Sequence, residues 1–334
     1  DTCPRSSEET ASPSPIASDT GRDDGYTPHI PTRRPSFLED VGHLELRSNS
    51  NLCEAEATSD IRHREVTVRV RGADFNSQVQ GDGQAFVWGH GLSNNMEAED
   101  WLGWFDWPSF PEDIRLIRYD ARGHGKTETA ADPLAYTWPE LGLDMLAIAN
   151  AHGVDRFVAG GASMGCSTTL FAAMEAPERI MAMVLVIPPT AWESRAAQAS
   201  TYRRSARIGG VLGGRLLGAA MKRQATDLLA PWMLEEAPRM IEGMAMGLRP
   251  QTRRGLRNMF LGAGASNLPE PAAFEPIAHI PAIILPWTED PSHPVATAEQ
   301  LHRLLPNSEL VVEEGFAGLE AFPDRIREFV ARYA

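Results

Sequence analysis

The residues of this sequence whose types and spacing could do chemistry begin with a serine between two glycines. Gly161-Ala-Ser163-Met-Gly165 lies between a predicted strand, residues 157–161, and a predicted helix, residues 164–175. In that context the G-x-S-x-G pattern is typical of a tight turn that lifts a nucleophilic hydroxyl out of a sheet. The two glycines leave room for the turn and for close packing of helix on strand. The sequence therefore predicts Ser163 as a nucleophile. The alternative is a glycine-rich turn without a reactive role.

A serine hydroxyl is a weak nucleophile unless a nearby base takes its proton. Asp290 and His293 stand three residues apart in a loop that Pro291 and Pro294 stiffen. One turn of the chain could bring the carboxylate to one ring nitrogen, while the other nitrogen faces Ser163. We therefore expect His293 to be the base and Asp290 to be the acid that orients it.

Other arrangements of these groups are open at this stage. His293 could merely cap the following helix, and Asp290 could act as an acid near a helix N-terminus. His90 and His124 also follow predicted strands, and open α/β sheets place their sites at such strand ends. We expect His90 to pack beneath the site and His124 to stabilise its own turn.

The elements that must position these residues alternate between strand and helix. Strands are predicted at residues 65–70, 72–80, 85–88, 114–119, 157–161, 180–187, 282–285 and 310–312, and helices at residues 138–151, 164–175, 296–305 and 323–333. Such alternation predicts an α/β fold with a doubly wound, mostly parallel sheet. Residues 190–275 interrupt it with helical, glycine-rich segments, as a cap over a site does. We predict a core of residues 64–189 and 276–334, a helical cap at 190–275, and a disordered Ser/Pro/Asp-rich tail at 1–60.

With these motifs the chain resembles the α/β-hydrolase fold superfamily, and its serine esterases and lactonases in particular, over about residues 64–334. The segment from Trp88 to Leu92, WGHGL, is similar to the family's His-Gly turn after the third strand. The segment from Asp120 to Gly125, DARGHG, resembles its D-x-R-G-x-G turn, and Trp287 to Pro294 resembles the loop that carries its acid.

The resemblance implies further site residues. The backbone N–H groups of Leu92 and Met164 would form the oxyanion hole. Around them, the residues that support the motifs would be His90, Gly91, Gly161 and Gly165. The family's catalytic histidine, however, follows the last strand. Here residues 308–322, SELVVEEGFAGLEAF, contain no histidine, none follows as far as Ala334, and Phe316 stands about where it belongs. If His293 is the base, it has moved from the family's position after the last strand to the loop that carries Asp290.

Two functions follow from this reading, and cofactor-free chemistry other than hydrolysis, such as perhydrolysis or C–C cleavage, stays a third possibility that nothing in the sequence selects. The first is a serine hydrolase that acts on a small apolar ester, lactone or related acyl compound. The second is a catalytically inactive protein of hydrolase fold that binds a small molecule or a partner, which the missing histidine favours. The first function is favoured by Ser163, by the two turns that carry Leu92 and Met164, and by Asp290. A protein that catalyses no reaction needs none of them.

The composition of the chain limits which binding partners, cofactors and cellular compartment we expect. The formal charge is −14, which argues against nucleic acid. No apolar run is long enough to span a bilayer, so we expect no membrane partner. The cysteines, Cys3, Cys53 and Cys166, are odd in number and irregular in spacing, which predicts a reducing, cytoplasmic setting. No histidine or cysteine spacing is typical of a metal site, so we expect no metal and no cofactor. The oligomeric state stays open.

Overall fold

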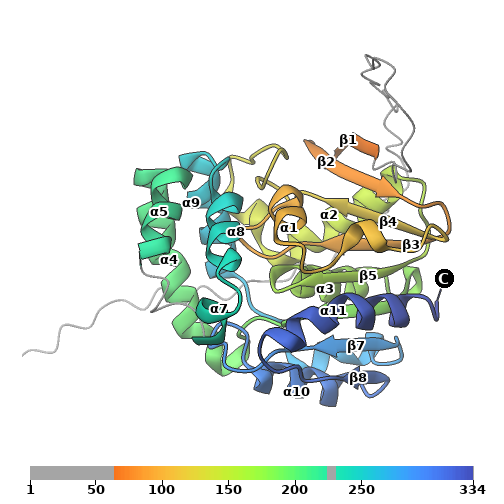
Figure 1. Ribbon diagram of the computed structural model, residues 1–334. Coiled ribbons are helices and arrows are strands. Elements are labelled where there is room, and N and C mark those ends of the chain that lie inside the picture. The colour runs from red at the N-terminus through yellow and green to blue at the C-terminus, as the bar shows by residue number, and fades with distance from the viewer. Residues whose placement is uncertain (1–63, 224–230, 334) are drawn as a thin grey trace, which may run out of the picture. The chain divides into compact units, whose positions relative to one another are not determined.

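The strands of this protein form one mixed sheet. The structure is a computed structural model that describes residues 64–223 and 231–333, and the predicted tail at 1–60 lies outside them. In the described residues the sheet has eight strands in the order β1-β2-β4-β3-β5-β6-β7-β8 (Figure 1). Their bounds are β1 Arg64–Val70, β2 Ala73–Gln80, β3 Gln84–Gly89, β4 Ile114–Tyr119, β5 Phe157–Ala162, β6 Ile180–Val186, β7 Ala282–Leu285 and β8 Ser308–Leu310.

The pairing of the strands confirms the predicted doubly wound, mostly parallel sheet. β1 and β2 are an antiparallel hairpin whose turn, Arg71-Gly72, has φ of 47° and 75° at its two residues. Positive φ at both positions matches the right-handed twist of the flanking strands. β2 also pairs antiparallel with β4, whereas every pair from β4 through β3 to β8 is parallel. The carboxyl ends of the parallel strands therefore meet at one edge, where the site is expected.

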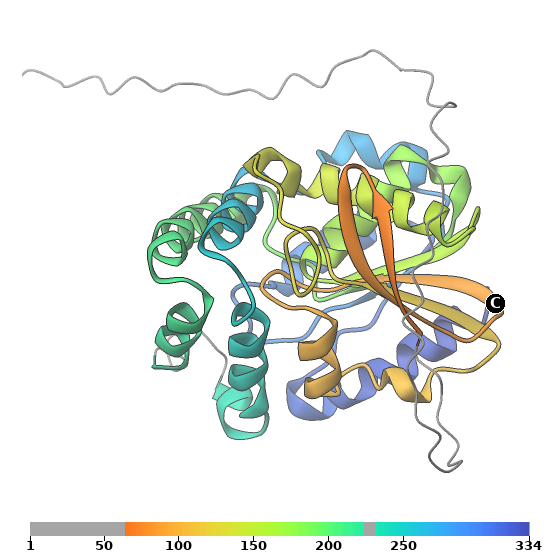
Figure 2. The same ribbon diagram turned by 90° about the horizontal axis from the view of Figure 1, so that it is seen from above.

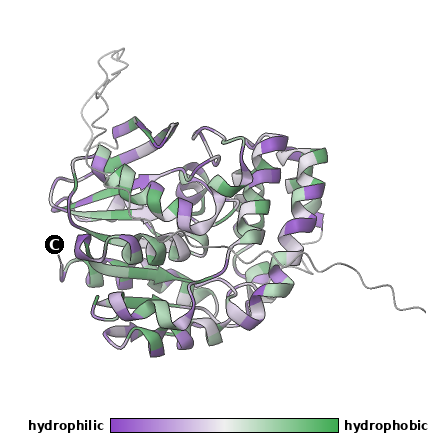
Figure 3. Cartoon of the chain, turned by 180° about the vertical axis from the view of Figure 1, so that it is seen from behind, coloured by the Kyte–Doolittle hydropathy of each residue, from purple (hydrophilic) through white to green (hydrophobic). Residues whose placement is uncertain are grey.

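Helices cover both faces of the sheet, as a parallel sheet requires. α2 Trp138–Ala151, α3 Met164–Glu175 and α10 Val295–Leu304 pack on one face, in a core with β-strand residues such as Val87 and Ile284. α11 Gly315–Val330 packs on the other face with Phe86, Trp88 and Trp107. Figures 1 and 2 show α11 and α1 Met96–Leu102 on the side opposite to α2 and α3. The strands between them are mostly hydrophobic (Figure 3).

Five α-helices of the described residues lie between β6 and β7 and are called the insert below. They are α4 Arg195–Leu212, α5 Gly214–Arg223, α7 Pro231–Glu235, α8 Arg239–Leu248 and α9 Arg253–Ala265. Leu217, Leu248, Leu256 and Met259 of the insert are buried in a hydrophobic cluster that also contains Tyr136, from before α2. Gly209 permits close helix packing, since a Cβ there would lie 3.3 Å from Leu256 Cβ. The division of the chain into core and cap, and the role of a cap, stay predictions.

Two elements near the C-terminus differ from their predicted bounds. β8 covers 308–310 rather than 310–312, because the register that pairs Ile284 with Leu310 ends the strand there. α11 begins at Gly315 rather than at Pro323, which lies inside the helix. The first turns of α11 bury Leu319 and Phe322 in the core, and this apolar burial outweighs the backbone hydrogen bond that a proline removes.

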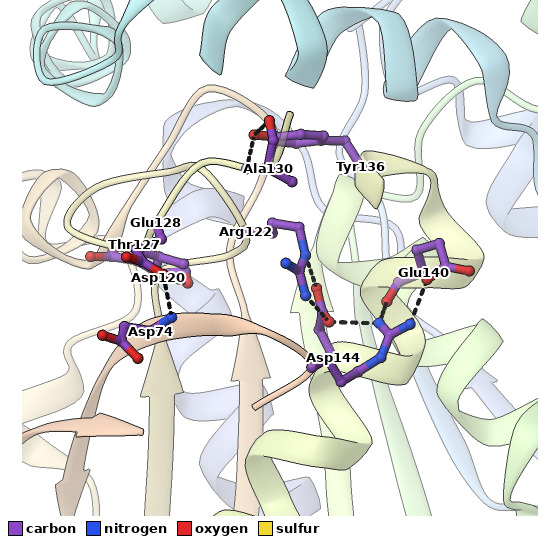
Figure 4. Close-up of polar contacts among 10 residues, drawn as sticks. Asp74, Asp120, Arg122, Thr127, Glu128, Ala130, Tyr136, Glu140 and Asp144 are labelled. Carbon is purple, nitrogen blue, oxygen red and sulfur yellow. Dashed lines mark hydrogen bonds and ion pairs between the residues drawn. The ribbon is translucent and has the colours of Figure 1, made fainter. Parts of the chain in front are cut away.

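The D-x-R-G-x-G turn is tied to its neighbours by charged groups (Figure 4). Arg122 donates from Nε and Nη2 to the carboxylate of Asp144 on α2, at 2.9 and 2.7 Å. Asp144 also accepts a hydrogen bond from Arg71 of the hairpin turn, at 2.6 Å. Asp120 Oδ1 accepts from the backbone N–H of Met96, where α1 begins. These contacts join the hairpin, the turn and the start of α1, which flank the carboxyl ends of β3 and β4.

Helix α1 carries a buried carboxyl group. Glu99 on α1 is 2% exposed and accepts hydrogen bonds from Trp88 Nε1 at 3.2 and 3.4 Å. Burial raises the pKa of Glu99 to about 8, although Arg118 and Trp88 favour the charged form. The folded protein therefore keeps a proton that the unfolded chain releases near its ordinary pKa of about 4.3.

Because Glu99 binds its proton more tightly in the folded state, we predict that Glu99 lowers the free energy of unfolding increasingly as the pH rises. Because the folded pKa is the higher one, this destabilisation is absent below about pH 4 and complete above about pH 8. Glu99→Gln keeps the shape and removes the titration, so its free energy of unfolding should exceed the parent's by roughly 2–4 kcal/mol at pH 9. The difference should shrink to under about 1 kcal/mol at pH 4.5 in urea unfolding. Glu97→Gln, on the exposed side of α1, is the control. A pH-independent difference for Glu99→Gln would contradict the prediction.

Candidate active site

Ser163 lies at the junction of β5 and α3, in a backbone conformation that side chains rarely adopt. Its φ is 53° and its ψ is −108°, and its N–H donates to Val186 O on β6 at 3.0 Å. The flanking glycines permit the turn. A Cβ on Gly161 would lie 2.5 Å from the carbonyl carbon of Gly165, and a Cβ on Gly165 would lie 1.9 Å from Gly89 O. The G-x-S-x-G sequence therefore has a steric reason at both glycines, and the serine stands at the carboxyl ends of the strands.

His293 connects Ser163 to Asp290 through two hydrogen bonds. Its Nε2 lies 2.8 Å from Ser163 Oγ, and its Nδ1 lies 2.6 Å from Asp290 Oδ2. A carboxylate only accepts, so Nδ1 carries the proton and Nε2 presents a lone pair to the serine hydroxyl. The structure thus brings together the three residues predicted from the sequence, in the order a Ser-His-Asp triad requires. Their catalytic roles stay predictions.

Asp290 is held by more than the histidine. Trp287 Nε1 donates to Asp290 Oδ2 at 2.9 Å, and the backbone N–H of Ser292 donates to Oδ1 at 2.8 Å. Burial alone would raise the pKa of Asp290, but electrostatic attraction to the His293 ring and the hydrogen bonds from that ring, Trp287 and Ser292 outweigh burial and lower the pKa to about 2. The carboxylate therefore stays charged at neutral pH and keeps the tautomer of His293 that a general base needs.

Trp287 is a hydrogen-bond partner of Asp290 that the sequence did not identify, because an indole three residues before an acid has no distinctive spacing. We expect Trp287→Phe to lower kcat of ester hydrolysis about tenfold, since it removes one charge-assisted hydrogen bond to Asp290 and keeps most of the ring packing. Trp104→Phe is the matched control, because the Trp104 ring packs on Trp287 at 6.1 Å between centroids. Steady-state kinetics on both variants would check it. Equal losses in the two would assign the effect to packing instead.

The stretch in which the family's histidine is missing supports the loop that carries His293. The backbone N–H of Glu313 donates to Pro286 O, and the N–H of Thr288 donates to Glu313 O. On the other side, the N–H of Thr190 after β6 donates to Ser292 O at 3.1 Å. Phe316 packs against the core in the first turn of α11. The loop of Asp290 and His293 is thus anchored from both neighbouring strand ends.

The predicted oxyanion donors flank the serine. A Cβ on Gly91 would lie 3.6 Å from Ser163 Cβ, so the turn after β3 lies close to Ser163, and Leu92 follows Gly91 directly. Met164 is the first residue of α3. Within residues 64–223 and 231–333, neither the Leu92 nor the Met164 backbone N–H donates a hydrogen bond to another residue. Both are therefore free for an anion that forms at the serine.

His90 and His124 have their own partners and do not hydrogen-bond Ser163. His90 Nδ1 donates to Gly91 O at 2.8 Å, and its Nε2 accepts from the Ala121 N–H at 2.9 Å. His124 Nδ1 donates to Arg122 O at 3.0 Å. Burial lowers the pKa of His90 to about 4 and of His124 to about 3, so both rings are neutral at pH 7. His90 thus joins the turns after β3 and β4, and His124 braces its own turn.

Aromatic side chains gather beside the histidine. The ring of Trp287 lies 6.3 Å from that of His293, and Trp104 and Trp232 pack edge-on against Trp287, with Trp232 at 5.6 Å. Trp232 and Trp287 are 7% and 3% exposed, so most of this aromatic surface packs against other side chains of the core. In the described part of the chain no group of three or more His, Cys, Asp or Glu side chains is arranged to hold a metal ion, and no helix there has the length and apolar character needed to cross a membrane.

Comparison with known proteins agrees with this architecture. A family model described as alpha/beta hydrolase fold matches residues 85–317. The chain is 24% identical over 237 residues to 3-oxoadipate enol-lactonase 2 of Acinetobacter baylyi, covering 70% of this chain and 82% of that protein. A solved hydrolase of Pseudomonas aeruginosa is similar with a TM-score of 0.65 and 24% identity, covering 80% of this chain and 97% of the other. A thermophilic esterase of Thermogutta terrifontis has a TM-score of 0.64 and 19% identity, covering 81% and 97%.

Proposed function

The chain belongs to the alpha/beta hydrolase fold family, and we propose that it is a serine hydrolase that cleaves small carboxylic esters or lactones. The observation that carries the proposal is the pair of hydrogen bonds from Ser163 Oγ to His293 and from His293 to Asp290, 2.8 and 2.6 Å long. That arrangement activates a hydroxyl that would otherwise be a weak nucleophile.

Acylation begins when His293 Nε2 takes the proton of Ser163 as Oγ attacks the ester carbonyl carbon. The carbonyl oxygen becomes an oxyanion, which accepts hydrogen bonds from the Leu92 and Met164 N–H groups. Asp290 stabilises the charge on the His293 ring through Nδ1. The tetrahedral intermediate collapses, the C–O bond to the alcohol breaks, and His293 gives its proton to the departing alkoxide. The products of this half are an acyl-serine and a free alcohol.

Deacylation repeats the sequence with water. His293 Nε2 takes a proton from water, the hydroxide oxygen bonds to the acyl carbon, and the same N–H groups hold the oxyanion. The bond to Ser163 Oγ then breaks, and His293 returns the proton to the serine. A carboxylic acid leaves and the site is restored. With a lactone, alcohol and acid are two ends of one molecule, so a single hydroxy acid is released.

Two features support this substrate class. The chain is 24% identical to an enol-lactonase of Acinetobacter baylyi and similar in fold to an esterase of Thermogutta terrifontis, and both names describe cleavage of carboxylic ester bonds. The Trp287 ring, 6.3 Å from that of His293 between centroids, and the Trp104 ring that packs on it favour an apolar acyl or alcohol group next to the triad.

The alternative of an inactive binding protein rested on the absence of a histidine after the last strand. The hydrogen bonds of His293 to both Ser163 and Asp290 support the hydrolase over that alternative. A binder has no need of a base that holds the serine hydroxyl.

The test is a hydrolysis panel with p-nitrophenyl esters of two to twelve acyl carbons and simple five- and six-membered lactones. We expect saturable turnover of short esters, lactones or both. Absence of turnover on the whole panel, in protein that unfolds cooperatively, would contradict the proposal. The inactive binding protein would then be the favoured alternative.

A further inference from the structure

The first two helices of the insert have a charge opposite to that of the protein as a whole. Residues 194–223, which include α4 and α5, contain seven Lys and Arg residues and no Asp or Glu, although the chain has a formal charge of −14. Of these cations, Arg203, Arg204, Arg207, Arg215 and Arg223 are exposed. Such a concentration on an acidic protein marks a surface for an anionic partner.

Exposed apolar side chains lie in the same place. Ile208, Val211, Leu212 and Leu216 are 41%, 70%, 37% and 58% exposed, four of the six large hydrophobic side chains exposed in the described residues. They stand where α4 turns through Gly213 into α5, and we call these four residues the insert corner. Single exposed hydrophobic residues need no explanation, but a concentration of them at one corner does.

Arginines surround the insert corner from three helices. Arg207 and Arg215 stand next to Ile208 and Leu216 in the sequence. Two arginines of α9 lie near Gly210 and Gly213, the glycines that stand between these apolar residues in the sequence. A Cβ on Gly210 would be 3.4 Å from Arg257 Cβ, and a Cβ on Gly213 would be 3.5 Å from Arg253 Cγ. The ion pairs that the described residues of the insert do make, Lys222–Glu242 and Arg249–Glu242, use other cations.

We propose that the insert corner docks on the surface of an anionic lipid membrane. The four apolar side chains would enter the boundary between headgroups and acyl chains, and the surrounding arginines would bind lipid phosphates. Arginine suits this place because its long stem lies along apolar surface while the guanidinium stays among the headgroups. This departs from the expectation of no membrane partner, and it requires no spanning helix.

Other occupants fit the surface less well. A second copy of the chain would bring the same arginines face to face across a two-fold axis, where they repel. A nucleic acid would pair with the arginines but gain nothing from the apolar side chains between them. An acidic protein is the remaining alternative, and the experiment separates it from lipid. The proposal does not depend on hydrolase activity, so its failure and that of the proposed function are distinguishable.

The test is flotation of the full chain with vesicles of phosphatidylcholine alone or mixed equally with phosphatidylglycerol. We expect at least tenfold tighter binding to the anionic vesicles, weakened by added salt. Val211→Glu with Leu216→Glu, and separately Arg207→Glu with Arg215→Glu, should each weaken binding at least tenfold. Leu134→Glu with Val312→Glu is the matched control, because these residues are 53% and 42% exposed outside the corner. It should bind like the parent.

Three outcomes would overturn the proposal. The first is no binding to anionic vesicles, and the second is binding that the corner variants leave unchanged. The third is a different occupant, seen either as a doubled mass in light scattering that the corner variants abolish, or as binding to polyglutamate without binding to vesicles. The substituted residues are all exposed, so we expect each variant to keep the parent's melting temperature within a few degrees.

Discussion

Replacing His293 with alanine should lower kcat of ester hydrolysis by about 10⁴ to 10⁶, the scale on which loss of a triad base acts. The reason is that His293 Nε2, 2.8 Å from Ser163 Oγ, is the base proposed to take the serine proton. The Leu92 and Met164 N–H groups and substrate binding remain, so a small rate above that of water should persist. Steady-state kinetics on the best ester or lactone of the panel would measure it.

The control for this variant is another histidine in the same part of the chain. His279 is exposed and precedes β7, at the opposite end of the strand from the site, so His279→Ala should keep the parent's kcat. The fold of His293→Ala should also persist, because Asp290 keeps its hydrogen bonds from Trp287 and Ser292. If His90→Ala or His124→Ala removes activity while His293→Ala keeps it, the relocated base is wrong.

Replacing Ser163 with alanine should abolish both turnover and covalent labelling. A fluorophosphonate probe reacts with an activated serine without needing the true substrate, so intact-mass analysis reports the nucleophile directly. The parent should gain the mass of one adduct and Ser163→Ala none, while His293→Ala should be labelled at a rate lower by about 10³ or more. The small side chain fits the turn, although the φ of 53° at this position leaves some backbone strain in either residue.

A nearby serine provides the control for the labelling. Ser167 is fully buried on α3, one helical turn after Ser163, and has no proposed role. Ser167→Ala should therefore be labelled like the parent. Labelling that survives in Ser163→Ala would identify another nucleophile and end the mechanism proposed above. Absence of labelling in the parent itself would favour the inactive binding protein.

The sequence by itself was sufficient for the fold class, and it singled out the three side chains that the structure brings together at the candidate site. Period-2 and continuous apolar runs predicted most strands to within a residue or two, because a parallel sheet needs strands that are buried on both faces. The tight turn at Ser163 could be predicted from the G-x-S-x-G segment alone, because both glycines are required sterically within that one turn. Asp290 and His293 could be paired for the same reason, since three residues separate them in one stiff loop.

Other features are decided only by the tertiary structure, because they join residues far apart in the chain. The contact between His293 and Ser163 spans 130 positions, and the loop that makes it is held by Thr190 on one side and Glu313 on the other. Trp287 becomes a partner of Asp290 only once that loop is folded. α11 begins before Pro323 because Leu319 and Phe322 gain burial in the core, an energy that no local propensity contains. Local sequence therefore determined the parts, and long-range packing decided how they meet.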